Sequence, residues 1–273
     1  MGEAFFAPDG DGYLAGELTR GPWDRAHQHA GPPAALIGRE VERLAADGSR
    51  RVGRITFEVL RPVPIGRLSV SARVARPGRR VELVEAELAA DGEVAIRATA
   101  WRLRSGEVDV PAELTSAGSA AASPGSTLRP GYAPPPPDDG EPRDFFPTGE
   151  EVGYHTAMDY RFVAGAFLDP GPATVWMRPR HPLVAGSELS PLERVLLAAD
   201  SGNGVSATLD FDRFVFVNVD LTVHLHRLPG GEWVCLDAVT IPERTGIGIS
   251  DTALYDERGP IGRAVQTLLV AER

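Results

Sequence analysis

One pattern occurs twice in this chain and constrains its fold more than any other feature. Arg61 is followed 36 residues later by the pair Arg97-Ala98, and Arg227 is followed 36 residues later by the pair Arg263-Ala264. Both stretches contain extended apolar segments preceded by a helix that begins at proline. Two copies of one unit favour a pseudo-dimer of two similar domains.

The first copy begins with a weak extended segment over 5–18 and a loop that leads to Pro32-Pro33. Proline is favoured in a first helical turn, and the apolar residues that follow have helical spacing up to the stop at Asp47-Gly48. Alternating apolar runs separated by turn residues then predict four strands. These runs are Val52–Leu60, Leu68–Ala75, Val81–Leu88 and Val94–Leu103.

The second copy repeats this order after extended segments at Met158–Val163 and Ala173–Met177. Ser190-Pro191-Leu192-Glu193 matches a capping box, so a helix is expected from Pro191 to Asp200, ended by Ser201-Gly202-Asn203-Gly204. Four more strands are predicted after this helix. They are Phe214–Leu225, Trp233–Ile241, Ile247–Tyr255 and Ile261–Val270.

Both predicted helices are apolar on more than one side, as expected for a helix wrapped by a curved antiparallel sheet. We therefore expect an α+β double hotdog, with two curved antiparallel sheets each wrapped around a central helix. The predicted units are an N-terminal hotdog at 1–104 and a C-terminal hotdog at 150–273, which carries the polar site. Residues 105–149 are rich in Pro, Gly and Ser and predict a linker.

Composition excludes several classes of function. The net charge of −10 argues against nucleic-acid binding, and no apolar run approaches the ~20 residues of a membrane span. The N-terminus lacks the features of a secretory signal, and Cys235 is the single cysteine, so a cytoplasmic protein without a metal or other cofactor is expected. Residues 39–80 hold eleven arginines and four acids, which indicates either solvated faces or a platform for a phosphorylated ligand.

Three polar residues of the second copy are candidates for chemistry. Alignment of the copies places Asn218 opposite Val52, Gln266 opposite Ala100, and Asp200 opposite Glu42 or Asp47. Strand alternation puts Asn218 on the face opposite to the wholly apolar one, which conflicts with a role beside the helix. Each residue could also be structural. Together, a carboxylate and two amides suit activation of a water for hydrolysis.

Other candidates are weaker. Ser201 and Cys235 lack the sequence context of a hydrolase nucleophile. His224 and His226 would bind a metal only with further ligands. His27 and His29 lie in a loop that a hotdog pair would place near the neighbouring unit's site.

The chain resembles the double-hotdog acyl-CoA thioesterases of the thioesterase II type. The resemblance rests on short motifs of the second copy and on Ala30-Gly31 before the first helix. The motifs are Ala198-Ala199-Asp200, Val217-Asn218-Val219-Asp220, His226-Arg227, Trp233 and Val265-Gln266.

This resemblance implies a thioesterase of lipid metabolism in which Asp200 activates a water held by Asn218 and Gln266. Such enzymes commonly have threonine where this chain has Asn218. A backbone N–H near Gly31 or Ser190 would meet the oxyanion. The expected substrate contacts are Gly31, His29, Arg61, Arg79 and Arg80.

Acyl-CoA is the expected partner, with no nucleic acid, no membrane span and possible assembly into a homo-oligomer. Two alternatives stay open. A hotdog hydratase or dehydratase would need an Asp and His pair, for which His181-Pro182 is a poor substitute in the sequence. A non-catalytic protein that binds acyl thioesters is the other.

Overall fold

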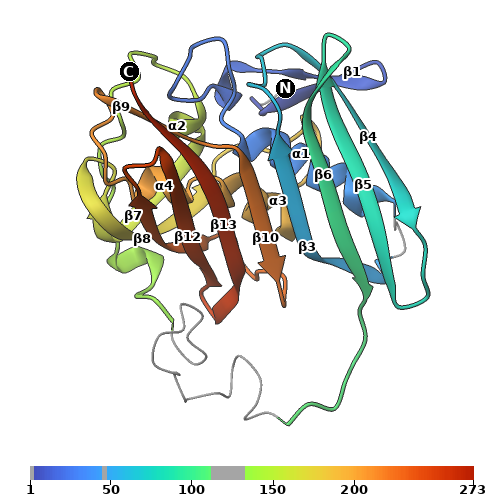
Figure 1. Cartoon of the computed structure of the whole chain (residues 1–273). Coiled ribbons are helices and arrows are strands. Elements are labelled where there is room, and N and C mark those ends of the chain that lie inside the picture. The colour runs from blue at the N-terminus through green and yellow to red at the C-terminus, as the bar shows by residue number, and fades with distance from the viewer. Residues whose placement is uncertain (1–2, 45–47, 112–132) are drawn as a thin grey trace.

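The protein, seen in a computed structural model, is described here over residues 3–44, 48–111 and 133–273. Thirteen antiparallel strands form one continuous curved sheet beside two central helices (Figure 1). The strands of the first half are β1 (Phe6–Asp9), β2 (Gly12–Ala15), β3 (Arg50–Val59), β4 (Arg67–Arg76), β5 (Val81–Ala90) and β6 (Glu93–Arg104). Those of the second half are β7 (Met158–Ala166), β8 (Asp169–Pro179), β9 (Phe214–Asn218), β10 (Asp220–Leu225), β11 (Val234–Pro242), β12 (Ile247–Asp256) and β13 (Gly259–Glu272).

The two halves share one sheet because β3 pairs with β10, for example Phe57 with Leu221. The expectation of two separate sheets is therefore wrong at this seam. Along the sheet the order is β1-β2-β4-β5-β6-β3-β10-β13-β12-β11-β8-β7, with β9 paired to β13. An unpaired edge strand exposes a row of backbone donors and acceptors, and each of the two strands supplies the other's missing partners.

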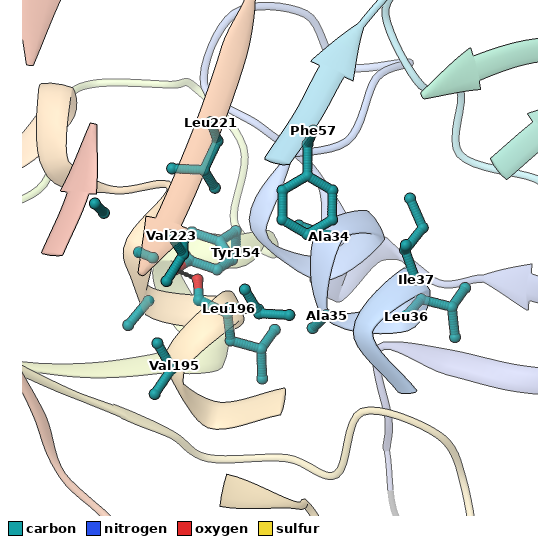
Figure 2. Close-up of a cluster of buried hydrophobic side chains, with 14 of the residues drawn as sticks. Ala34, Ala35, Leu36, Ile37, Phe57, Tyr154, Val195, Leu196, Leu221 and Val223 are labelled. Carbon is teal, nitrogen blue, oxygen red and sulfur yellow. Dashed lines mark hydrogen bonds between the residues drawn. The ribbon is translucent and has the colours of Figure 1, made fainter. Parts of the chain in front are cut away.

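The central helices α1 (Gly31–Arg43) and α3 (Pro191–Ala199) pack against each other on the concave side of the sheet. Figure 2 shows apolar side chains of both helices meeting those of β3 and β10, with Phe57 and Leu221 above the helices. A Cβ on Gly38 would meet the end of the Leu196 side chain, so glycine allows this close approach without displacing Leu196. The predicted capping box is confirmed: Glu193 N donates to Ser190 Oγ over 3.1 Å, and Ser190 N donates to Glu193 Oε2 over 3.0 Å.

Shorter helical segments complete the fold. They are η1 (Glu17–Thr19), η3 (Pro137–Asp139), α2 (Tyr154–Ala157) and α4 (Gly202–Val205). Within the described residues, no helix has the length and apolar character needed to cross a bilayer.

The predicted strand 214–225 is two strands separated by a bulge at Val219. Asn218 pairs with Leu268 of β13, whereas Thr222 pairs with Val265. The chain therefore advances four residues from β9 to β10 while β13 advances three. The extra residue reverses the side-chain alternation. Phe216 and Asn218 of β9 therefore point to the helix side, as do Leu221 and Val223 of β10, which removes the conflict seen in the sequence.

The end of the predicted linker packs against the second half. Pro137 and Phe146 are buried, and Trp176 Nε1 donates to the carbonyl of Pro135 over 2.7 Å. The described end of the predicted linker is therefore packed onto the second half and is not a free tether. The Ser- and Gly-rich run 116–125 lies outside the described residues.

Candidate functional site

Asp200 lies at the C-terminal end of α3, and its side chain is only 4% exposed. Its Oδ1 accepts hydrogen bonds from Asn218 Nδ2 at 2.9 Å and from Gln266 Nε2 at 3.2 Å. A buried carboxylate needs such donors, because the helix C-terminus disfavours negative charge. The three polar residues predicted from the sequence do converge.

Neither amide nitrogen is left free to hold a water. Gln266 Nε2 also donates to the main-chain carbonyl of Asp200 at 3.1 Å, and its Oε1 accepts from Asn203 N at 3.2 Å. Asn218 Nδ2 also donates to the carbonyl of Asp220 at 3.2 Å. The amides therefore fix the carboxylate, and only Asn218 Oδ1 remains for a further contact in the described part of the chain.

His29 joins this group from the other half of the molecule. Its Nδ1 lies 3.1 Å from Asp200 Oδ2 and 3.1 Å from the backbone N of Gly31, the first residue of α1. The site is therefore built across the two halves, as expected for the loop that carries His29. Burial lowers the pKa of His29, and the nearby Asp200 charge opposes that shift.

Tyr154 holds the imidazole in place. The two rings are stacked, with centroids 3.8 Å apart and an interplanar angle of 6°. The phenol donates to the carbonyl of Leu197 at 2.5 Å and lies 3.0 Å from Ser201 Oγ. Burial raises the pKa of Tyr154, so its phenol stays neutral. No motif in the sequence indicated Tyr154, because it contacts its partners only after folding.

A cavity of about 490 Å³ opens beside Asp200, His29 and Asn218. Its remaining wall is mainly apolar and comes from both halves and from the packed end of the predicted linker. The aromatic lining residues are Trp23, Phe145, Phe146, Tyr154, Phe167 and Phe216. A cavity with a largely apolar wall and a few convergent polar groups suits an acyl chain.

The predicted substrate contacts divide into two groups. Arg61 lines the cavity and pairs with Glu93. Arg79 and Arg80 lie at the other end of the first-half strands, where Arg80 O accepts from Arg104 N at 2.7 Å. A strand rises about 3.3 Å per residue, so Arg104 lies roughly 25 Å along β6 from the end of the strand near the cavity. The structure therefore does not bring Arg79 and Arg80 to the site.

Several other candidates supply neither a nucleophile nor a metal ligand. Ser201 contacts Tyr154, and burial raises the pKa of the Cys235 thiol, so neither is an activated nucleophile. His224 faces outward, paired across the sheet with Arg54 and Arg263. Among the described residues, no group of His, Cys, Asp and Glu side chains could hold a metal.

Two family models match the chain. The model described as the acyl-CoA thioesterase N-terminal domain matches residues 19–103, and the model described as the acyl-CoA thioesterase C-terminal domain matches residues 133–270. Together they cover both halves of the sheet. No curated protein matches the chain in sequence.

Solved structures share the fold along nearly the whole chain. A Thermobifida fusca protein assigned as a thioesterase II is 18% identical, with a TM-score of 0.71 over 96% of this chain and 93% of that one. An acyl-CoA thioesterase II from Mycobacterium marinum is 15% identical, with a TM-score of 0.62 over 97% and 93%. A hotdog-fold protein of unknown function from Alicyclobacillus acidocaldarius is 16% identical, with a TM-score of 0.68 over 98% and 95%.

Proposed function

This chain belongs to the acyl-CoA thioesterase family, and we propose that it hydrolyses acyl-CoA thioesters at Asp200 by direct attack of water. The observation that carries this proposal is the buried carboxylate of Asp200 at the wall of a largely apolar cavity, fixed by Asn218 and Gln266. The carboxylate supplies the negative charge that draws a proton from water. No covalent intermediate is needed.

The acyl chain would occupy the aromatic part of the cavity, between the two halves. The thioester carbonyl would lie near the N-terminus of α1, where the backbone N–H of Gly31 could donate to the developing oxyanion. Arg61, at the cavity wall, is the arginine that would meet the phosphates of CoA. Two observations support these placements: Arg61 lines the cavity, and so does Ala30, which immediately precedes Gly31.

The test is release of free thiol from a series of acyl-CoA substrates. We expect Asp200→Asn to lower kcat by at least ~100-fold, the usual contribution of general-base chemistry. Asp251→Asn is the control, because Asp251 pairs with Arg263 on the outer face of the sheet. Full activity of Asp200→Asn, or tight binding of acyl-CoA without turnover by the unmodified protein, would contradict the proposal.

One observation favours a second candidate, a hydratase acting on enoyl thioesters. Such an enzyme needs an Asp and His pair, and folding brings His29 next to Asp200. Incubation with an enoyl-CoA and its saturated analogue separates the two functions. Hydration consumes the enoyl chromophore without release of thiol, whereas a thioesterase releases thiol from both.

A further inference from the structure

We propose that His29 is the group that takes the proton from the attacking water, and that Asp200 acts through it. This inference rests on the proposed thioester hydrolysis and identifies the proton acceptor within the same site. It follows from the contacts of three atoms: the two carboxylate oxygens of Asp200 and the Nδ1 atom of His29.

The Asp200 carboxylate is largely occupied by donors. Oδ1 accepts from Asn218 and Gln266, and Oδ2 lies 3.1 Å from His29 Nδ1. Both carboxylate oxygens therefore already have close polar neighbours. With a side chain that is 4% exposed, Asp200 also has less access to water than His29, whose side chain is 13% exposed.

The contacts of Nδ1 determine where the imidazole proton lies. Nδ1 accepts a hydrogen bond from Gly31 N–H at 3.1 Å, and Asp200 Oδ2 lies at an ion-pair distance of 3.1 Å from the same atom. A proton on Nδ1 would replace the first bond by donation to Oδ2. The two bonds exclude each other. A hydrogen bond to an ionised acceptor is about twice as strong as one between neutral groups, so we place the proton on Nδ1 in the reactive state.

This tautomer leaves the lone pair of Nε2 free. Within the described residues Nε2 has no hydrogen-bond partner. It is also not fully buried, so solvent can reach it. His29 lines the cavity, and stacking on Tyr154 fixes the plane of its ring. The same tautomer also frees the Gly31 N–H from the imidazole.

The reaction is then balanced without a further co-reactant. Water gives one proton to His29 Nε2 while its oxygen forms a bond to the thioester carbonyl carbon, and Asp200 stabilises the imidazolium through Nδ1–H. When the carbon–sulfur bond breaks, its electron pair goes to sulfur, and Nε2 returns the proton to the thiolate. The products are the free acid and the thiol, and His29 is neutral again.

The experiment compares His29→Gln, His29→Ala and Asp200→Asn, with His226→Gln as a control at the end of β10, away from the cavity. We expect His29→Gln to lower kcat by about 100-fold or more with KM within a few-fold of the original. In the original protein kcat/KM should decrease at acid pH as His29 becomes protonated, and we expect this decrease to be absent in His29→Gln. Added imidazole should restore activity to His29→Ala in proportion to the concentration of neutral imidazole.

The possible outcomes separate this inference from the proposed function. One outcome is that kcat of His29→Gln stays within about threefold of the original, or that its kcat/KM still decreases at acid pH, while Asp200→Asn is inactive. Asp200 then takes the proton itself, and only the role of His29 is wrong. Loss of activity in His29→Ala without rescue by imidazole would also overturn it, because a merely structural role predicts that result. Full activity of Asp200→Asn would instead contradict the proposed function.

Discussion

The amide nitrogen of Asn218 lies 2.9 Å from Oδ1 of Asp200, and this contact exists because β9 ends at a bulge. Without the extra residue at Val219, the alternation of buried Leu221 and Val223 would turn Asn218 to the outer face. The bulge therefore orients a site residue while the apolar face of β10 stays buried.

Asn218 should matter for turnover more than for substrate binding. Asn218→Ala removes a donor to a charged acceptor, which is worth about 1.5–3 kcal/mol, so we expect kcat to decrease ~10- to 100-fold. Asn218→Thr, whose hydroxyl can still donate, should lose less. Steady-state thiol release measures both, and an unchanged kcat in Asn218→Ala would show that the contact is dispensable.

Gln266 should contribute to stability as well as to activity. Its side chain is 2% exposed and bonds to Asp200 and to Asn203 N. Gln266→Leu leaves these groups unpaired, so we expect a loss of about 1–3 kcal/mol in the free energy of unfolding. Urea denaturation measures this loss, and an unaltered unfolding midpoint would contradict it.

Arg61 and the pair Arg79/Arg80 should behave differently, although the sequence makes them equal candidates. Arg61→Ser should raise KM for acyl-CoA several-fold, and the increase should shrink at high salt because exposed charges are screened. It should leave KM unchanged for a short acyl thioester without phosphates. The double variant Arg79→Ser/Arg80→Ser is the matched control, and an equal effect there would argue against the placement of CoA at Arg61.

Phe146 should limit the length of the acyl chain. It lines the cavity and is 6% exposed, so Phe146→Leu should enlarge the cavity and shift the preference toward longer acyl groups. The cost in stability should be about 1 kcal/mol, as for a modest reduction of a core side chain. Phe5→Leu, at a buried position outside the cavity lining, controls for stability, and its chain-length profile should not change.

Acid should destabilise the protein partly through His29. Burial holds the pKa of His29 below its ordinary value of 6.5 in the folded protein. As pH falls through 6.5 the unfolded chain binds a proton that the folded protein does not, so the free energy of unfolding decreases. His155, His224 and His226 shift in the same direction.

The expected slope for such a group is at most about 1.4 kcal/mol per pH unit. Urea unfolding should therefore show that the free energy of unfolding decreases less between pH 7 and pH 5 in His29→Gln than in the original protein. Tyr154 and Asp200 are the titratable groups that face His29, and both are kept in this variant. Equal losses would show that His29 does not titrate in this range.

Much of the fold could be predicted from sequence because it depends on local patterns. The helix that starts at Pro191 follows from its capping box, and the apolar runs of each copy gave strands close to those observed. The repeated spacing of Arg61 and Arg227 indicated two related units. The residue types of Asp200, Asn218 and Gln266 likewise indicated a carboxylate and two amides, which the fold brings into contact.

The sequence by itself thus determined the two central helices, most of the strands and the three polar residues that meet at Asp200. Only the tertiary structure decided that one sheet joins the units, that Asn218 faces Asp200, and that His29 and Tyr154 complete the site. The physical reason is that these features depend on pairing between distant segments: β3 with β10, β9 with β13, and the loop before α1 with the end of α3. Periodicity along one strand or helix contains no information about those partners.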